Sequence, residues 1–259
     1  MLAPLHEAPL AYFFIATLVA VSLAALRKRR LFETLRMHPY SLYRGKRMFT
    51  VFTSVFVHVD EKHLLINGGL LCLTLPEVEY MLVDDFGVWA GHGLELLFIA
   101  FTAVFVGVLA AIQHRYHPAH RSAGASALVL AAALFFLMYF PVEPIGVMPG
   151  FMAGLLPIWI AFIMLFVLVV QVWLREPAGA VHLYGALAGV LLACSIRPIS
   201  LIEIAAFVSE ESDDKSARYN HATDHADDDT AEERPFPAFA ACDGFRLIGV
   251  QAIHSRWND

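Results

Sequence analysis

The sequence predicts an all-α membrane protein, a bundle of six transmembrane helices followed by a disordered acidic C-terminal tail. Its composition points to a membrane, because 58% of the 259 residues are hydrophobic, 16% are charged and the mean hydropathy is +0.61, unlike soluble domains. The apolar residues also lie in six runs of roughly the length that crosses a bilayer core of about 30 Å. These runs cover residues 10–26, 61–83, 93–113, 124–141, 151–174 and 180–207.

The first apolar run is expected to remain in the mature protein. Its basic cluster, residues 27–30, follows the run instead of preceding it, which reverses the charge order of a secretory signal. The charged stretch between the first two runs predicts a partly helical loop at the membrane interface. The loop after the third run carries His114, His117 and His120, but Pro118 prevents them from sharing one helical face. A polar loop is therefore expected there, and no metal site.

The chain divides by composition into a membrane domain, residues 1–207, and a tail, residues 208–259. The tail carries twelve acidic residues against five Lys and Arg, and its central stretch has too little apolar content to fold by itself. The chain's three cysteines, Cys72, Cys194 and Cys242, are scattered. Their number and spacing argue against a disulfide framework and against a cysteine-based metal site.

Small residues recur every four positions in the last run, at Gly185, Gly189 and Ala193. This spacing is typical of membrane helices whose backbones approach closely. The fourth run is the expected neighbour, because its first residues, 124–127, and Ala131 are also small.

Polar side chains in membrane helices carry a free-energy cost and are functional candidates by default. His63 and Asn67 are four residues apart, so they share one face of the second helix. His58 precedes that helix, and His182 lies on the sixth. For a histidine and asparagine alone, hydrogen bonds between helices would be the simpler interpretation.

Ser126 changes that interpretation. It falls in the first turn of its helix, after Gly124, close to unpaired backbone N–H groups and the positive end of the helix dipole. A serine there is often only an N-cap. With His182 as a base it can also act as a nucleophile, and His63 and Asn67 would donate to a developing oxyanion. No acidic residue lies beside His182 in the sequence, which favours a Ser-His dyad over a triad.

Three short motifs resemble those of the rhomboid family of intramembrane serine proteases. The stretch that leads from Arg47 to His58, His63 and Asn67 resembles the family's arginine and H-x4-H-x3-N signature. "GAS" at 124–126 resembles its G-x-S nucleophile motif, and "HLYGALAG" from His182 resembles its catalytic-histidine helix. The order and the six spans match as well, over roughly residues 10–200.

The resemblance implies a role for each matched residue. Ser126 would be the nucleophile and His182 the general base. His63, Asn67 and the Ser126 N–H would form the oxyanion hole, with His58 and Gly124 as supporting residues and Arg47 structural. No cofactor and no metal are implied. The expected partners are single-span membrane proteins as substrates and the lipid bilayer, not nucleic acid, and the expected location is the plasma or inner membrane, as a multi-pass protein.

Two departures keep an alternative open, a rhomboid-like pseudoprotease that binds membrane clients without cutting them. Ala127 stands where the family usually has glycine after the serine, and Glu79 and Gly87 match its E-x3-G pattern only loosely. The orientation stays open too. The family topology places the basic first loop outside the cell, whereas the positive-inside rule places it in the cytoplasm.

Overall fold

A computed structural model describes residues 3–142, 156–176 and 178–209 of the chain. Within these residues all the regular structure is helical, apart from one isolated bridge between Met37 and Ser122. The helices are α1 (Pro9–Arg27), α2 (Arg29–Leu35), α3 (Pro39–Tyr43), α4 (Thr50–Thr53), the 3-10 turn η1 (Ser54–Phe56), α5 (Glu61–Phe86), α6 (Val88–Gln113), α7 (Ser126–Tyr139), α8 (Pro157–Trp173), α9 (Gly179–Ile196) and a helix over Ile199–Ser209.

The predicted all-helical membrane fold is confirmed, with one main helix, α1 or one of α5 to α9, in each of the six apolar runs. The start of the fifth run, 151–155, lies outside the described residues. Three of them, α1, α6 and α9, are long and apolar enough to cross a membrane by length and composition, and α7 and α8 are shorter apolar helices. The basic stretch after α1 forms α2, α3, α4 and η1, as expected for a partly helical loop. The acidic residues from 210 onward lie outside the described part of the chain.

The sixth predicted run needs a correction, because it is not one continuous helix over 180–207. It breaks at Arg197, whose backbone is non-helical (φ −123°, ψ 76°), and a new helix starts at Ile199. The cause is Pro198, which has no N–H for the helical ladder and disfavours helical geometry in the residue before it.

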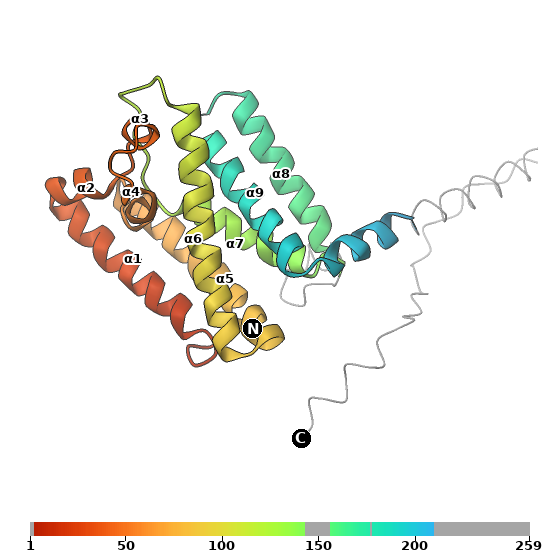
Figure 1. The fold of residues 1–259 in the computed structure, drawn as a ribbon. Helices are drawn as coiled ribbons and strands as arrows, with labels where there is room; N and C mark the ends of the chain where they lie inside the picture. The colour runs from red at the N-terminus through yellow and green to blue at the C-terminus, as the bar shows by residue number, and fades with distance from the viewer. Residues whose placement is uncertain (1–2, 143–155, 177, 210–259) are drawn as a thin grey trace, which may run out of the picture. The chain divides into compact units, whose positions relative to one another are not determined.

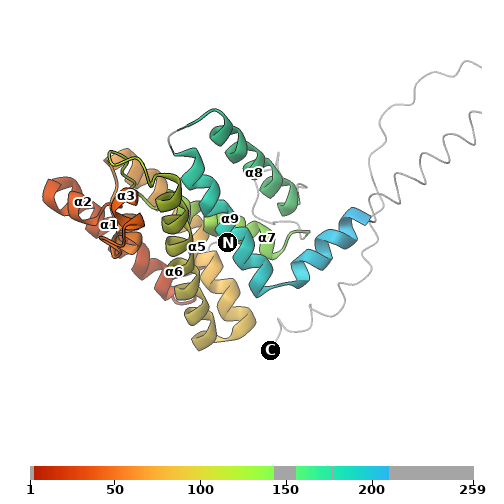
Figure 2. The ribbon, with the colours of Figure 1, turned by 45° about the horizontal axis from the view of Figure 1, so that its top comes forward.

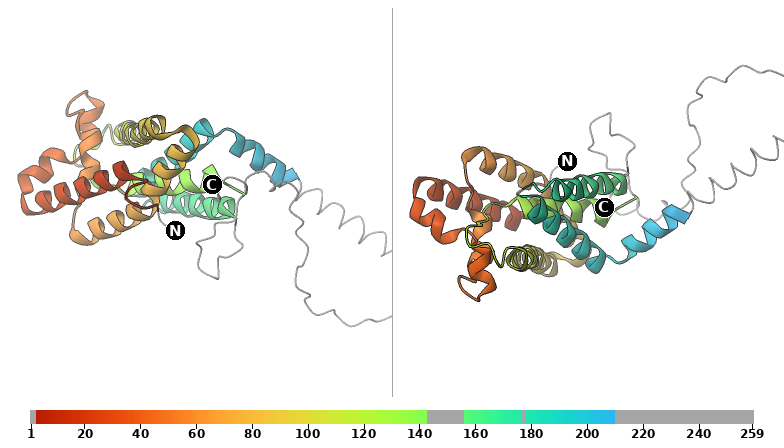
Figure 3. Two further views of the ribbon diagram at one scale, coloured as in Figure 1. Left: turned by 90° about the horizontal axis from the view of Figure 1, so that it is seen from below. Right: turned by 90° about the horizontal axis from the view of Figure 1, so that it is seen from above.

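The short helix α7 lies inside the bundle. In Figure 1, α1 and α2 lie on one side and α8 on the other, with α7 between them. Figure 3 shows the same separation of α1 and α2 from α8 from below and from above. The view of Figure 2 shows α9 running beside α7, and α7 packs more extensively on α9 than any other pair of helices does. Most of the α7 side chains are buried.

Two glycines of α9 set the distance between α9 and α7. A Cβ atom placed on Gly185 would lie 2.2 Å from the Ala127 carbonyl oxygen, and one on Gly189 would lie 2.1 Å from that of Ala131. No side chain fits in that space, so the backbones of α7 and α9 touch. The predicted partnership between the small residues of these two helices is confirmed.

Polar side chains satisfy the free backbone groups at the start of α1 and at the end of α2. The first free N–H groups of α1, those of Leu10 and Ala11, donate to the buried Glu79 carboxylate at 3.1 and 2.7 Å. This satisfies donors that a helix start leaves unpaired. Arg47 caps the other end of the segment, since its guanidinium donates to the carbonyls of Glu33 and Thr34 in the last turns of α2, both at 2.7 Å.

We expect Gly189→Ala to destabilise the protein, because one methyl forces α9 away from the Ala131 carbonyl and opens a gap along the helix contact. The matched control is Gly93→Ala on the exposed face of α6, where a Cβ meets no atom within 4 Å. Thermal unfolding in detergent should show a lower midpoint for Gly189→Ala and an unchanged or slightly higher one for Gly93→Ala. Equal midpoints would contradict the close contact.

Candidate functional site

The site begins at the turn that leads into α7. Gly124 has φ +115°, a backbone region that residues with a Cβ rarely adopt. A Cβ there would also lie 2.7 Å from the His63 ring and 3.6 Å from the Asn67 Nδ2. Glycine is therefore required twice, for the turn and for the close approach of this backbone to α5. As a result, Ser126 opens α7 directly beside His63 and Asn67.

His58 holds the same turn from behind. It is fully buried, and its Nε2 accepts a hydrogen bond from the Ala125 N–H at 3.2 Å. Its Nδ1 lies 2.8 Å from the Ser22 Oγ, which donates to the Phe56 carbonyl at 2.8 Å. Because the Ser22 hydroxyl donates to Phe56, it accepts from His58, so the imidazole is neutral with its proton on Nδ1. The chain of bonds ties α1, the loop before α5 and the start of α7 together.

Burial lowers the pKa of His58 from 6.5 to about 4, and the neighbouring His63 acts in the same direction against Asp60. The shift agrees with the hydrogen bonds, because a protonated ring could not accept from Ala125. His58 therefore holds the backbone of the turn before Ser126 in place. Sequence reasoning missed its partner Ser22, whose single hydroxyl in an apolar run gave no signal that it would reach a residue 36 positions away.

His63 and Asn67 lie one turn apart on α5 and face the Gly124 turn. The Asn67 Nδ2 is buried and has no hydrogen-bond partner within the described residues. An unpaired buried donor is rare in folded proteins. Close to it, the first turn of α7 supplies the backbone N–H groups that every helix start leaves free, since the first bond of this helix runs from the Val129 N–H to the Ala125 carbonyl. These donors point to a site for a negatively charged oxygen.

Ser126 and His182 approach each other through the α7–α9 contact. Ser126 precedes Ala127, whose carbonyl faces Gly185, and His182 lies three residues before Gly185 in the first turn of α9. Both residues are partly exposed. Across the described ranges, neither side chain makes a hydrogen bond. Catalytic hydrogen bonds are often long without substrate, so the absence of a hydrogen bond between Ser126 and His182 is compatible with a dyad.

Ala127 does not widen the helix contact. The atoms that face Gly185 are the Ala127 backbone atoms O, C and Cα. Ala127 also lines a small internal cavity of about 30 Å³ between α4, α6 and α7, with Val51, Ser54 and Thr102 among the other walls. The glycine that this contact needs is Gly185 on α9, and the extra methyl at 127 leaves α7 and α9 in backbone contact.

We expect acid to destabilise the protein through His58. Between pH 6.5 and about 4 the unfolded chain binds a proton at this residue and the folded protein does not, so stability falls as the pH falls through that window. At pH 5 the loss is roughly 2 kcal/mol relative to pH 7.5. Thermal unfolding of His58→Gln should show a lower midpoint at pH 7.5 but a smaller drop on acidification. The control His117→Gln, in the exposed α6–α7 loop, should retain the full drop, and an equal drop in both variants would be evidence against this role.

Comparison with known proteins adds the family. The sequence model of the rhomboid domain matches residues 45–199, a range that contains Arg47, His58, His63, Asn67, Gly124, Ser126 and His182. No curated protein matches the chain significantly. The matched segment covers more than half of the chain and runs from the first loop through α9, so the chain belongs to the rhomboid family.

Proposed function

We propose that this rhomboid-family membrane protein is an intramembrane serine protease that cleaves single-span membrane proteins within or near their transmembrane helix. One observation carries the proposal. The unpaired Asn67 Nδ2 lies close to Gly124, and the free N–H groups of the first turn of α7 begin two residues later, at Ser126. A set of donors without acceptors, next to a hydroxyl at a helix start, fits the stabilisation of an oxyanion.

The chemistry follows the dyad scheme. His182 takes the proton of the Ser126 hydroxyl as Oγ forms a bond to the scissile carbonyl carbon. The carbonyl oxygen becomes an oxyanion that accepts from Asn67, His63 and the Ser126 N–H. The carbon–nitrogen bond then breaks as His182 returns the proton to the leaving amine. Water, deprotonated by the same histidine, hydrolyses the acyl-enzyme and regenerates Ser126.

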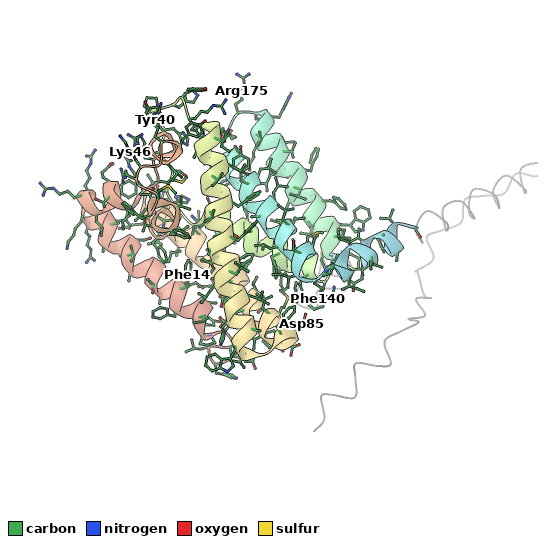
Figure 4. The ribbon with its side chains drawn as sticks, in the orientation of Figure 1. Phe14, Tyr40, Lys46, Asp85, Phe140 and Arg175 are labelled. Atoms are coloured by element: carbon green, nitrogen blue, oxygen red, sulfur yellow. The ribbon has the colours of Figure 1, made fainter. Side chains whose placement is uncertain are left out.

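The helices support a multi-pass arrangement for this reaction. We place the six main helices, α1 and α5 to α9, in the bilayer, with the site near the end of the bundle that carries the first loop. Tyr40 and Lys46 mark that loop in Figure 4, and Asp85 and Phe140 mark the other end. A topology map of the termini would give the side to which the site opens, and membrane fractionation would give the membrane, plasma or inner.

Ser126→Ala should abolish cleavage, because alanine has no hydroxyl to acylate. The assay is cleavage of a fluorescent single-span substrate by the full chain in liposomes. Ser195→Ala is the matched control, since Ser195 is an α9 serine whose hydroxyl only donates to the Leu191 carbonyl, and it should keep the wild-type rate. Cleavage by the Ser126→Ala variant would contradict the assignment of Ser126 as the nucleophile.

The second candidate, a pseudoprotease, is favoured by one observation, the absence of a Ser126–His182 hydrogen bond within the described ranges. A fluorophosphonate probe separates the two functions. The protease should label at Ser126, with loss of labelling in Ser126→Ala, whereas a client-binding pseudoprotease should neither label nor cleave.

Asn67→Ala should lower kcat by about 10²–10³, the usual effect of removing one oxyanion donor. The folded protein should lose little stability, because the deleted Nδ2 has no partner and its removal breaks no hydrogen bond. Cleavage kinetics and thermal unfolding measure the two effects. Thr74→Ala on the exposed face of α5, where the hydroxyl only bonds the Leu70 carbonyl, is the control. A rate for Asn67→Ala equal to that of the control would contradict the oxyanion role.

A further inference from the structure

The bundle contains a second polar cluster where α1 begins, α5 ends and α6 begins (Figure 1). Glu79 on α5 and His92 and Glu95 on α6 bring one potential ligand atom each within 4.8 Å of one another. Both glutamates are fully buried, and the His92 side chain is 22% exposed. None of the three belongs to the Ser126 site.

Glu95 has no donor among the described residues that would stabilise its ionised carboxylate. Both of its carboxylate oxygens are buried without a hydrogen bond to any described residue. Buried carboxylates normally have several hydrogen-bond donors or a counter-ion, because the free-energy cost of removing them from water is otherwise not compensated. The Glu95 carboxylate lies close to Glu79 and His92. A group that compensates its negative charge must therefore bind between these three residues.

His92 and Glu79 also have lone pairs available between them and Glu95. The His92 Nδ1 lies 2.9 Å from the Glu79 Oε1, but the two atoms are not aligned as a hydrogen bond and this nitrogen has no partner within the described ranges. The two Glu79 oxygens accept from the N–H groups of Leu10 and Ala11. Each carboxylate oxygen has two lone pairs, so Glu79 can hold the start of α1 and still bind a further group.

The charges of the cluster call for a cation. In its metal-binding form the cluster has two ionised glutamates and a neutral imidazole, so it carries two negative charges, and the N–H groups at the start of α1 are already used by Glu79. A divalent cation would neutralise both carboxylates. It would also supply the missing partner of Glu95 and of the His92 nitrogen.

We propose that Glu79, His92 and Glu95 bind one divalent transition-metal ion of the zinc class. One imidazole nitrogen with two carboxylates suits Zn²⁺, which takes N and O ligands at about 2.0–2.2 Å in a four-coordinate site. Mg²⁺ and Ca²⁺ prefer oxygen ligands in larger number. Water completes the coordination, because His92 lines an open pocket of about 370 Å³.

The same pocket gives the ion a route to the site. Its walls include Glu7 and Asp84 together with His6, and carboxylates at the mouth raise the local concentration of cations. Once bound, the ion would link α5 to α6 and, through Glu79, to the first turn of α1. Its role is therefore to stabilise the fold, and its binding does not depend on the proposed protease activity.

The test is zinc binding by the full-length chain in detergent after removal of metals with EDTA. Wild-type protein should bind one equivalent of Zn²⁺ and gain thermal stability. Glu95→Gln and His92→Gln should weaken this binding by 10-fold or more and remove the gain. Mass spectrometry of retained metal and thermal unfolding with Zn²⁺, Mg²⁺ or Ca²⁺ provide the measurements, with no response expected for Mg²⁺ and Ca²⁺.

Two controls separate this site from the chain's other histidines. His6→Gln changes an exposed histidine of the same pocket, and a double variant, His221→Gln with His225→Gln, changes the histidines of the acidic stretch. Both should bind zinc as the wild type does.

X-ray absorption spectroscopy of the zinc-loaded wild type tests the proposal without any variant. One imidazole and otherwise oxygen ligands are expected. Two or more imidazoles, zinc binding unchanged in Glu95→Gln, or no zinc-dependent stabilisation of the wild type would each overturn the proposal.

Discussion

The backbone contact between α7 and α9 is the constraint on which the candidate site depends. Gly185 and Gly189 leave no room for a Cβ against the carbonyls of Ala127 and Ala131, so the two helices share one fixed distance at two successive turns. Lipid provides no hydrophobic force to drive helices together, and small residues gain close packing instead. Because Ser126 and His182 each lie within one turn of the first of these contacts, the packing of the helices also determines how the two residues of the proposed dyad are placed.

A second set of bonds holds the serine in place without using the serine itself. The turn before α7 is fixed by the Gly124 N–H on the Ser54 carbonyl at 3.0 Å and by the Ala125 N–H on His58. His58 is itself held by its hydrogen bond to Ser22 of α1. The Ser126 hydroxyl stays free of these bonds. The backbone before Ser126 is therefore fixed while its hydroxyl remains available. A rigid scaffold preorganises a site in this way.

The sequence predicted the parts of the site that depend on local spacing. The four-residue period of His63 and Asn67 placed them on one face, and that of Gly185 and Gly189 identified the helix pair. It did not predict contacts between distant segments, such as Ser22 with His58 or Glu79 with the start of α1, because nothing local to either residue specifies its partner. The break at Pro198 was visible in the sequence, but the apolar residues on both sides of it gave the appearance of one long helix.

Buried polar groups of this fold fall into two kinds, those with hydrogen-bond partners and those without. Ser22, His58 and Glu79 have partners, and each holds helices together. Asn67 Nδ2 and the Glu95 oxygens have none among the described residues. A lone donor is complementary to a negative oxygen, and a lone carboxylate to a cation. The first lies beside the Gly124 turn, and the second, on α6, lies close to Glu79 of α5. One helix, α5, therefore contributes Asn67 to the proposed oxyanion site and Glu79 to the proposed cation site.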